Sequence, residues 1–293
     1  MQIQPRPFAQ VLGEALNGLA ATWRPIVSTS LLIFVPVGLL ALLTFQWTGG
    51  TEFLDAVLND PDSLETLTDE ALTELINSFL TAAAIAAAIQ TLGTIFVYLA
   101  SHKVVGEGIA GNSITGSEAR RFALKRYPVA FLTCLIAIVI VAGLGTLGYL
   151  VWSIPFGFGS AAGFVNFLFL VACVAPAIWF SIAFSMLLPI VALERRGPIK
   201  AITRSFDIVR RRWWPTLGYL VVVGLLGTIA AQLIQLVALP LASLDNLSLG
   251  ISAASLVGLF AQGLIVAAIG AMWTGWYIDL RARNKSLTTD DLS

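Results

Sequence analysis

Three arginines, two tryptophans and a proline follow one another at residues 210–215, immediately before a long apolar run. Guanidinium groups bind phosphate, while indole rings stack on nucleobases or lie at the headgroup depth of a bilayer. The string RRRWWP is therefore typical of two kinds of site. One is a nucleic-acid surface, and the other is the point where a chain enters a membrane.

Residues suited to catalysis are scarce. The single histidine, His102, ends an apolar run, whereas phosphodiester hydrolysis would need metal-binding carboxylates and usually a histidine. Acids gather at residues 52–74, but their spacing does not match an EF-hand loop, and leucines at helical spacing indicate a solvated surface helix. Cys134 and Cys173 lie in apolar runs, where they are expected to pack as small side chains. The sequence predicts no enzyme, no metal site and no cofactor.

Five amides within apolar segments are a further candidate site. They could line a polar route across a bilayer, or they could hydrogen-bond between helices. No apolar segment carries an ionisable residue near its middle, where a secondary transporter usually keeps its ion-coupling groups. The five residues are Gln90, Asn166, Gln232, Gln235 and Gln262.

The elements that would position these residues are membrane-spanning helices. The chain is 57% hydrophobic and 12% charged, against about 25% charged for an average soluble protein. The fourth long apolar segment carries Pro176 and Pro189, which predict a kink or tilt. We expect an all-α, polytopic protein, because six segments reach the length of about 20 residues that a span needs. They are 25–46, 75–101, 128–152, 160–191, 215–241 and 250–278.

The charges are strongly segregated. All 17 lysine and arginine residues fall on one side of a six-span topology, and the loop at residues 52–74 on the other side is acidic. The positive-inside rule therefore predicts that both termini are cytoplasmic. RRRWWP then lies at the inner membrane surface, which argues against nucleic acid as a partner. The residues expected to contact inner-leaflet lipid are Arg24, Arg126, Arg210, Arg211, Arg212, Trp213 and Trp214.

A repeated junction predicts the internal organisation. Pro25, Pro128 and Pro215 each follow aromatic or basic residues and open a span. We expect a single membrane domain, 1–293, of three helix-hairpin units, each preceded by a cytoplasmic amphipathic helix. The units are 5–101, 114–191 and 198–280, with a short cytoplasmic tail at 281–293.

Side-chain spacing predicts how these helices pack. The helix before Pro215 should bury an apolar stripe and turn its charged residues to other faces. In the sixth span, small residues recur every four positions and predict close helix packing, within the chain or against another protein. The stripe is Ile199, Ile202, Phe206 and Val209, the charged residues are Lys200, Arg204, Asp207 and Arg211, and the small residues are Gly263, Ala267, Ala271 and Gly275.

Four segments resemble the membrane domain of the glycerophosphoryl diester phosphodiesterase family, especially its stand-alone, mostly actinobacterial members. The segments are LERRGPIKAITRSFDIVRRRWWPTLGYL, WYIDLRARNKSL, RPFAQVLGEALNGLAATWRP and GNSITGSEARRFALKRYP. The resemblance implies a bacterial plasma-membrane protein. In fused members a separate soluble barrel performs the hydrolysis, and no such barrel is expected after residue 280.

These patterns favour a non-enzymatic scaffold or accessory subunit that engages membrane lipids or a partner membrane protein, which includes a second copy of the chain. The alternative is a transporter or flippase for a lipid-like or small amphiphilic substrate.

Overall fold

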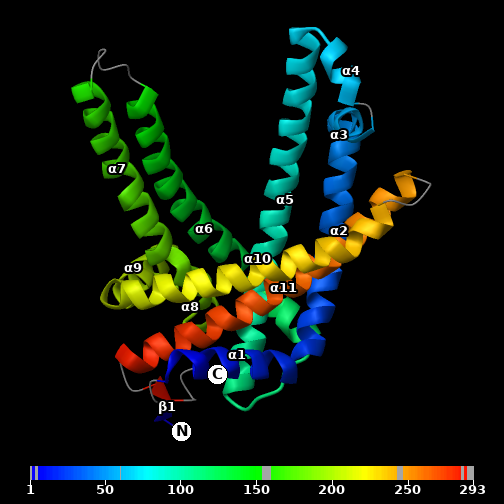
Figure 1. Cartoon of the computed structure of the whole chain (residues 1–293). Helices are drawn as coiled ribbons and strands as arrows, with labels where there is room; N and C mark the ends of the chain where they lie inside the picture. The colour runs from blue at the N-terminus through cyan, green and yellow to red at the C-terminus, as the bar shows by residue number, and fades with distance from the viewer. Residues whose placement is uncertain are drawn as a thin grey trace. The chain divides into compact units, whose positions relative to one another are not determined.

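The computed structural model describes residues 2–3, 6–59, 61–153, 160–242, 247–284 and 287–288. Within them the chain is mainly helical, with short turns between the helices and one antiparallel pair of two-residue strands, β1 (Gln2–Ile3) and β2 (Leu287–Thr288). The all-α prediction is confirmed (Figure 1). The helices are α1 (Phe8–Ala21), α2 (Trp23–Trp47), α3 (Gly50–Asn59), α4 (Pro61–Thr66), α5 (Asp69–Ile109), α6 (Gly116–Ser153), α7 (Ser160–Ala183), η1 (Phe184–Met186), α8 (Leu187–Leu193), α9 (Pro198–Val209), η2 (Arg210–Arg212), α10 (Trp213–Ala242) and α11 (Leu247–Asn284).

The described residues contain six helical segments that are long and apolar enough to cross a membrane. The six predicted spans are thus confirmed by length and composition. They identify a multi-pass membrane protein. The segments are Trp23–Trp47, Asp69–Ile109, Gly116–Leu150, Phe167–Leu193, Pro198–Leu236 and Ala261–Asn284.

Two of the three junction prolines begin a helix, and the third does not. Pro25 and Pro215 lie in the first turns of α2 and α10, where a missing N–H leaves no helical hydrogen bond unmade. Pro128 lies inside α6, so no separate surface helix precedes it. Ala119 and Ala123 before the proline and Ala130 after it are all fully buried, so small residues pack against the rest of the protein on both sides of that position.

The fourth span is interrupted where its prolines predict a disturbance. A 3-10 turn at Phe184–Met186 separates α7 from α8. Pro189 has no N–H to donate to the carbonyl four residues earlier, at Ser185, and its ring crowds that carbonyl. The chain therefore tightens into a 3-10 turn at this point.

The chain forms two compact units, each built from separated segments. Unit 1 comprises Met1–Pro25, Leu99–Gly227 and Ala268–Ser293, and unit 2 comprises Ile26–Tyr98 and Thr228–Ala267. This division does not test the predicted three-hairpin repeat, which stays a prediction, although the separate amphipathic helix expected before Pro128 is instead the first part of α6.

The core of unit 1 is aromatic where α1, α10 and α11 meet. Tyr219 is fully buried, its hydroxyl donates to the carbonyl of Met272 at 2.6 Å, and its ring stacks on Trp276 with centroids 4.8 Å apart. The ring of Phe8 meets the Tyr219 ring edge-on at 5.3 Å. In the same unit α6 and α7 run alongside each other (Figure 1).

Unit 2 packs through small residues. A Cβ added to Gly93 in α5 would lie 3.0 Å from Val37 of α2, and one added to Gly263 in α11 would lie 3.2 Å from the ring of Phe34. Phe34 is fully buried. The predicted role of Gly263 in close packing is therefore met within the chain.

Candidate functional site

Helix α9 is pinned against α7 by one polar and one aromatic contact. The hydroxyl of Ser205 donates to the carbonyl of Ala183 at 2.6 Å. The ring of Phe206 lies 4.9 Å from that of Trp179, nearly perpendicular to it. Since Phe206 is only four residues before Arg210, these contacts also set the position of the arginine turn that follows.

The buried face of α9 differs from the predicted stripe. Ile199 is 72% exposed, and Val209 is buried as expected. Ile202 and Phe206 are half-buried and pack against a buried cluster, while the small residues Ala201 and Ser205 are fully buried. The buried face of α9 thus includes most of the predicted stripe and also the small residues beside it.

The arginine turn and the start of α10 border a surface hollow. Residues 210–215 and Trp179 line an open depression of about 470 Å³, within the usual size range of small-ligand sites. Trp214 is 75% exposed, and its ring meets that of Trp213 edge-on at 4.8 Å. We call this depression the arginine–tryptophan hollow.

The hollow carries positive charge that the protein barely neutralises. Arg210 lies 3.9 Å from Asp207, but both side chains are at least half exposed, so this ion pair is weak. Neither Arg211 nor Arg212 pairs with any carboxylate among the described residues. The indole N–H of Trp213 is buried and has no acceptor in the described part of the chain.

Glu194, at the end of α8, ties α8 and α9 to α11. Its side chain is 7% exposed and accepts a hydrogen bond from the Tyr277 hydroxyl at 2.6 Å. Arg204 and Arg281 lie 3.3 Å and 3.7 Å from the same carboxylate oxygen, and Arg196 donates to the other oxygen. The arrangement joins two segments, residues 194–204 and residues 277–281, that are far apart in the sequence.

The electrostatics of Glu194 follow from these contacts. Glu194 lies just outside the spanning segment Phe167–Leu193. Burial opposes its charge, but the hydrogen bond from Tyr277 and the nearby guanidinium groups outweigh burial and hold the pKa of Glu194 below its usual range. Glu194 is therefore an ionised structural anchor, and we call it and its partners the Glu194 joint.

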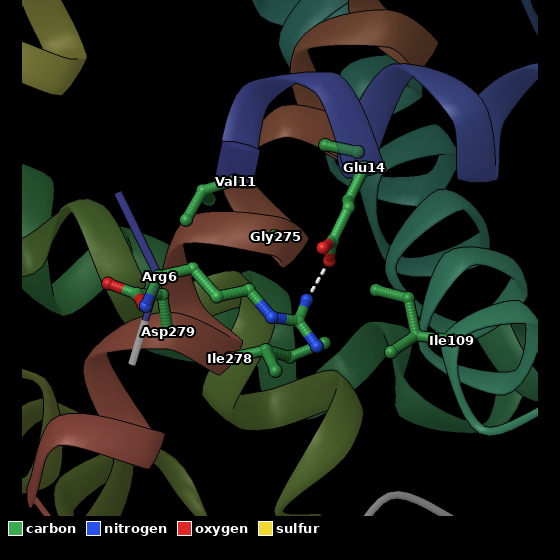
Figure 2. Close-up of a pocket in the computed structure, with 8 residues that line it drawn as sticks. Arg6, Val11, Glu14, Ile109, Gly275, Ile278 and Asp279 are labelled. Carbon is green, nitrogen blue, oxygen red and sulfur yellow. Dashed lines mark hydrogen bonds and ion pairs between the residues drawn. The ribbon is translucent and has the colours of Figure 1, made fainter. Parts of the chain in front are cut away.

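A second buried carboxylate anchors the chain's first residues. Asp279 is 3% exposed, accepts from the backbone N–H of Arg6 at 2.8 Å and accepts from Nε of Arg283 at 2.6 Å. Figure 2 shows the neighbouring ion pair of Arg6 with Glu14. The cavity there measures about 10 Å³, scarcely the space of one water, so it is a packing gap and no ligand site.

The other two predicted lipid-contacting arginines do not line the hollow. Arg24 lies over the ring of its neighbour Trp23, 5.6 Å from the centroid. Arg126 donates to the carbonyl of Arg195 at 3.2 Å, where the backbone adopts a left-handed conformation with φ of 54°. The structure therefore brings together only residues 210–214 of the predicted set.

The five amides of the possible polar route differ in exposure. Gln90 and Gln262 are half-buried, and Gln232 and Gln235 are exposed. None of these four hydrogen-bonds to another described residue, and none lines the hollow or the small cavity. The side chain of Asn166 lies outside the described residues. The polar route therefore stays a prediction, as does the alternative that these amides pair between helices.

His102 is a buried packing residue. It is 1% exposed, and its Nδ1 lies 2.8 Å from the hydroxyl of Thr274. Among the described residues, no three histidine, cysteine, aspartate or glutamate side chains come together as a metal site would require.

Sequence reasoning missed the two features that build the site. Trp179 lies in an apolar span, where a tryptophan carries no distinctive pattern. Glu194 had a usable signal, because acids are rare among the basic segments and this one directly ends an apolar run beside Arg195 and Arg196. An acid in that setting is expected to pair with arginine.

The spans and the charged end of unit 1 define an integral membrane protein with an arginine-rich surface hollow. No family model, curated protein or solved structure matches the chain. The resemblance to the phosphodiesterase membrane domain stays a prediction.

Proposed function

We propose that this protein is a non-enzymatic scaffold or accessory subunit of a bacterial plasma membrane, with both termini cytoplasmic, which engages membrane lipid or a partner membrane protein. The observation that carries the proposal is the arginine–tryptophan hollow, where Arg211 and Arg212 lack a carboxylate partner among the described residues. Unpaired cations beside indole rings suit the anionic inner surface of a bilayer.

The contrast with the other arginines supports a binding role for this turn. Arg204, Arg281 and Arg283 pair with buried carboxylates and stabilise the fold. An arginine whose charge is not used inside the protein is available to an external anion.

The alternative is a transporter or flippase for an amphiphilic substrate. It is favoured by Gln232 and Gln235, whose polar side chains are exposed on an apolar helix. Against this alternative, the sequence has no ionisable residue near the middle of a predicted span, and ion-coupled transport usually needs one.

Reconstitution in vesicles separates the two functions. Purified protein is placed in vesicles that contain a fluorescent phospholipid, and a membrane-impermeant quencher reports the labelled lipid in the outer leaflet. A scaffold leaves the quenched fraction equal to that of protein-free vesicles. A protein-dependent rise would contradict the scaffold proposal and favour the flippase.

A further inference from the structure

We infer that the arginine–tryptophan hollow is a discrete, saturable site for the phosphate-bearing headgroup of one anionic lipid. This inference rests on the proposed function and adds the chemical class of the ligand and its place in the fold. The site consists of Trp179 from α7 and residues 210–215 from η2 and the start of α10.

The charge of the hollow selects an anion. Three arginines line the hollow, and the one carboxylate paired with any of them among the described residues is the half-exposed Asp207, 3.9 Å from Arg210. Consecutive residues of a 3-10 turn project about 120° apart, so the three arginines would not converge on one point of a flat surface. All three nevertheless line the same depression of about 470 Å³. A phosphate group with several acceptor oxygens suits donors that approach from different directions.

The aromatic side chains select a lipid rather than a free anion. Trp179 and Trp213 give the hollow apolar walls, and Trp214 projects into the surroundings with 75% of its surface exposed. Indole rings favour the glycerol and headgroup region of a bilayer, where one face is apolar and the N–H remains polar.

The rigid surroundings make the site discrete. The ring of Phe206 lies 4.9 Å from that of Trp179, and Ser205 donates a hydrogen bond to the carbonyl of Ala183. These contacts join α7, which carries Trp179, to α9, which leads into the arginine turn. Arg204, the residue before Ser205 in α9, forms an ion pair with Glu194. The arginine turn is therefore presented by an anchored helix, which lowers the entropy lost on binding.

The test titrates the purified whole chain in detergent with phosphatidylglycerol, and separately with phosphatidylcholine of the same acyl chains, and counts bound lipid by native mass spectrometry. We expect one phosphatidylglycerol to saturate the protein. The double variant Arg211→Gln/Arg212→Gln should bind it about 30-fold more weakly, since each basic residue near a membrane surface contributes about fivefold. The matched control, Lys125→Gln/Lys200→Gln, removes the same charge from exposed positions outside the hollow and should change affinity less than twofold.

Two further arms keep the inference falsifiable. Asp207→Asn should tighten phosphatidylglycerol binding several-fold, because it frees Arg210. Trp214→Leu changes a side chain that is 75% exposed, and it should weaken binding several-fold.

Equal losses in the two double variants would show diffuse charge attraction and overturn the site. Displacement of the lipid by inorganic phosphate at constant ionic strength would show a soluble-anion site and overturn the lipid assignment. Weak, unsaturable binding alone would refute the headgroup site while leaving the scaffold proposal intact. Lipid flipping in vesicles would refute the scaffold proposal and leave the titration result standing.

Discussion

Replacing Glu194 by glutamine should lower the free energy of unfolding by about 2 kcal/mol. The substitution keeps the size of the side chain and an oxygen that can accept from Tyr277, but it removes the charge. Arg204 and Arg281, whose side chains are 24% and 17% exposed, then lack their counter-ion. Removing one partner of a fully buried ion pair costs about 3–5 kcal/mol, and we reduce that figure because both guanidinium groups retain some solvent.

The assay is reversible unfolding in mixed micelles, followed by intrinsic fluorescence. Asp207→Asn is the matched control, because Asp207 is 59% exposed and its pair with Arg210 is long. It should change the free energy of unfolding by less than about 0.5 kcal/mol. A double-mutant cycle with Arg204→Gln should show that this arginine stabilises the native protein far less once Glu194 is absent.

An effect of Glu194→Gln no larger than that of the control would refute the Glu194 joint. So would an additive cycle, because residues in one ion-pair network are expected to be coupled.

Three other predictions follow from the same geometry. The pKa of Glu194 is lower in the folded than in the unfolded protein, so its ionised form stabilises the fold above the unfolded pKa. This stabilisation is lost as the pH falls through the folded pKa. The wild-type protein should therefore lose more stability on acidification below about pH 4.5 than Glu194→Gln does. Gly275→Ala should destabilise the protein by about 1–2 kcal/mol in the same unfolding assay, because the added Cβ would lie 3.0 Å from Ala15. In the control Gly218→Ala the added Cβ meets nothing within 4 Å, so this change should be neutral or stabilising. Equal values would contradict the packing of α1 on α11. An impermeant maleimide applied to intact cells should label Asp62→Cys and not Lys200→Cys, and the reverse pattern would overturn the proposed orientation.

The spans were predictable because membrane insertion depends on simple, local quantities. Twenty apolar residues and a terminal cluster of charge locate a span without knowledge of its neighbours. The effect of Pro189 was likewise predictable, since the loss of a backbone N–H acts within one helical turn.

The helix surfaces were harder to predict because they depend on what packs against them. The stripe that ends at Val209 placed Ile199 on the buried face, yet Ile199 is 72% exposed. Arg204 was expected on a charged outer face, but it pairs with Glu194. A helix can bury either of two neighbouring faces with almost the same sequence pattern. Small residues such as Ala201 decide between them, because they let α9 pack closely against a helix far away in the sequence.

The hollow itself was half predictable. The string RRRWWP identified the arginine turn, because charge followed by indole and proline describes a membrane entry point. Trp179 was not identifiable, since its proximity to the turn arises from the packing of Phe206 in three dimensions.

The lipid that remains bound to the purified chain tests the central claim most directly. The protein is extracted from its membrane in a mild detergent, washed extensively, and its bound phospholipids are quantified beside those of the source membrane. The proposed function and the hollow predict about one anionic phospholipid per chain, enriched well above its proportion in the membrane. Bound phospholipid with the same composition as the source membrane would contradict the claim.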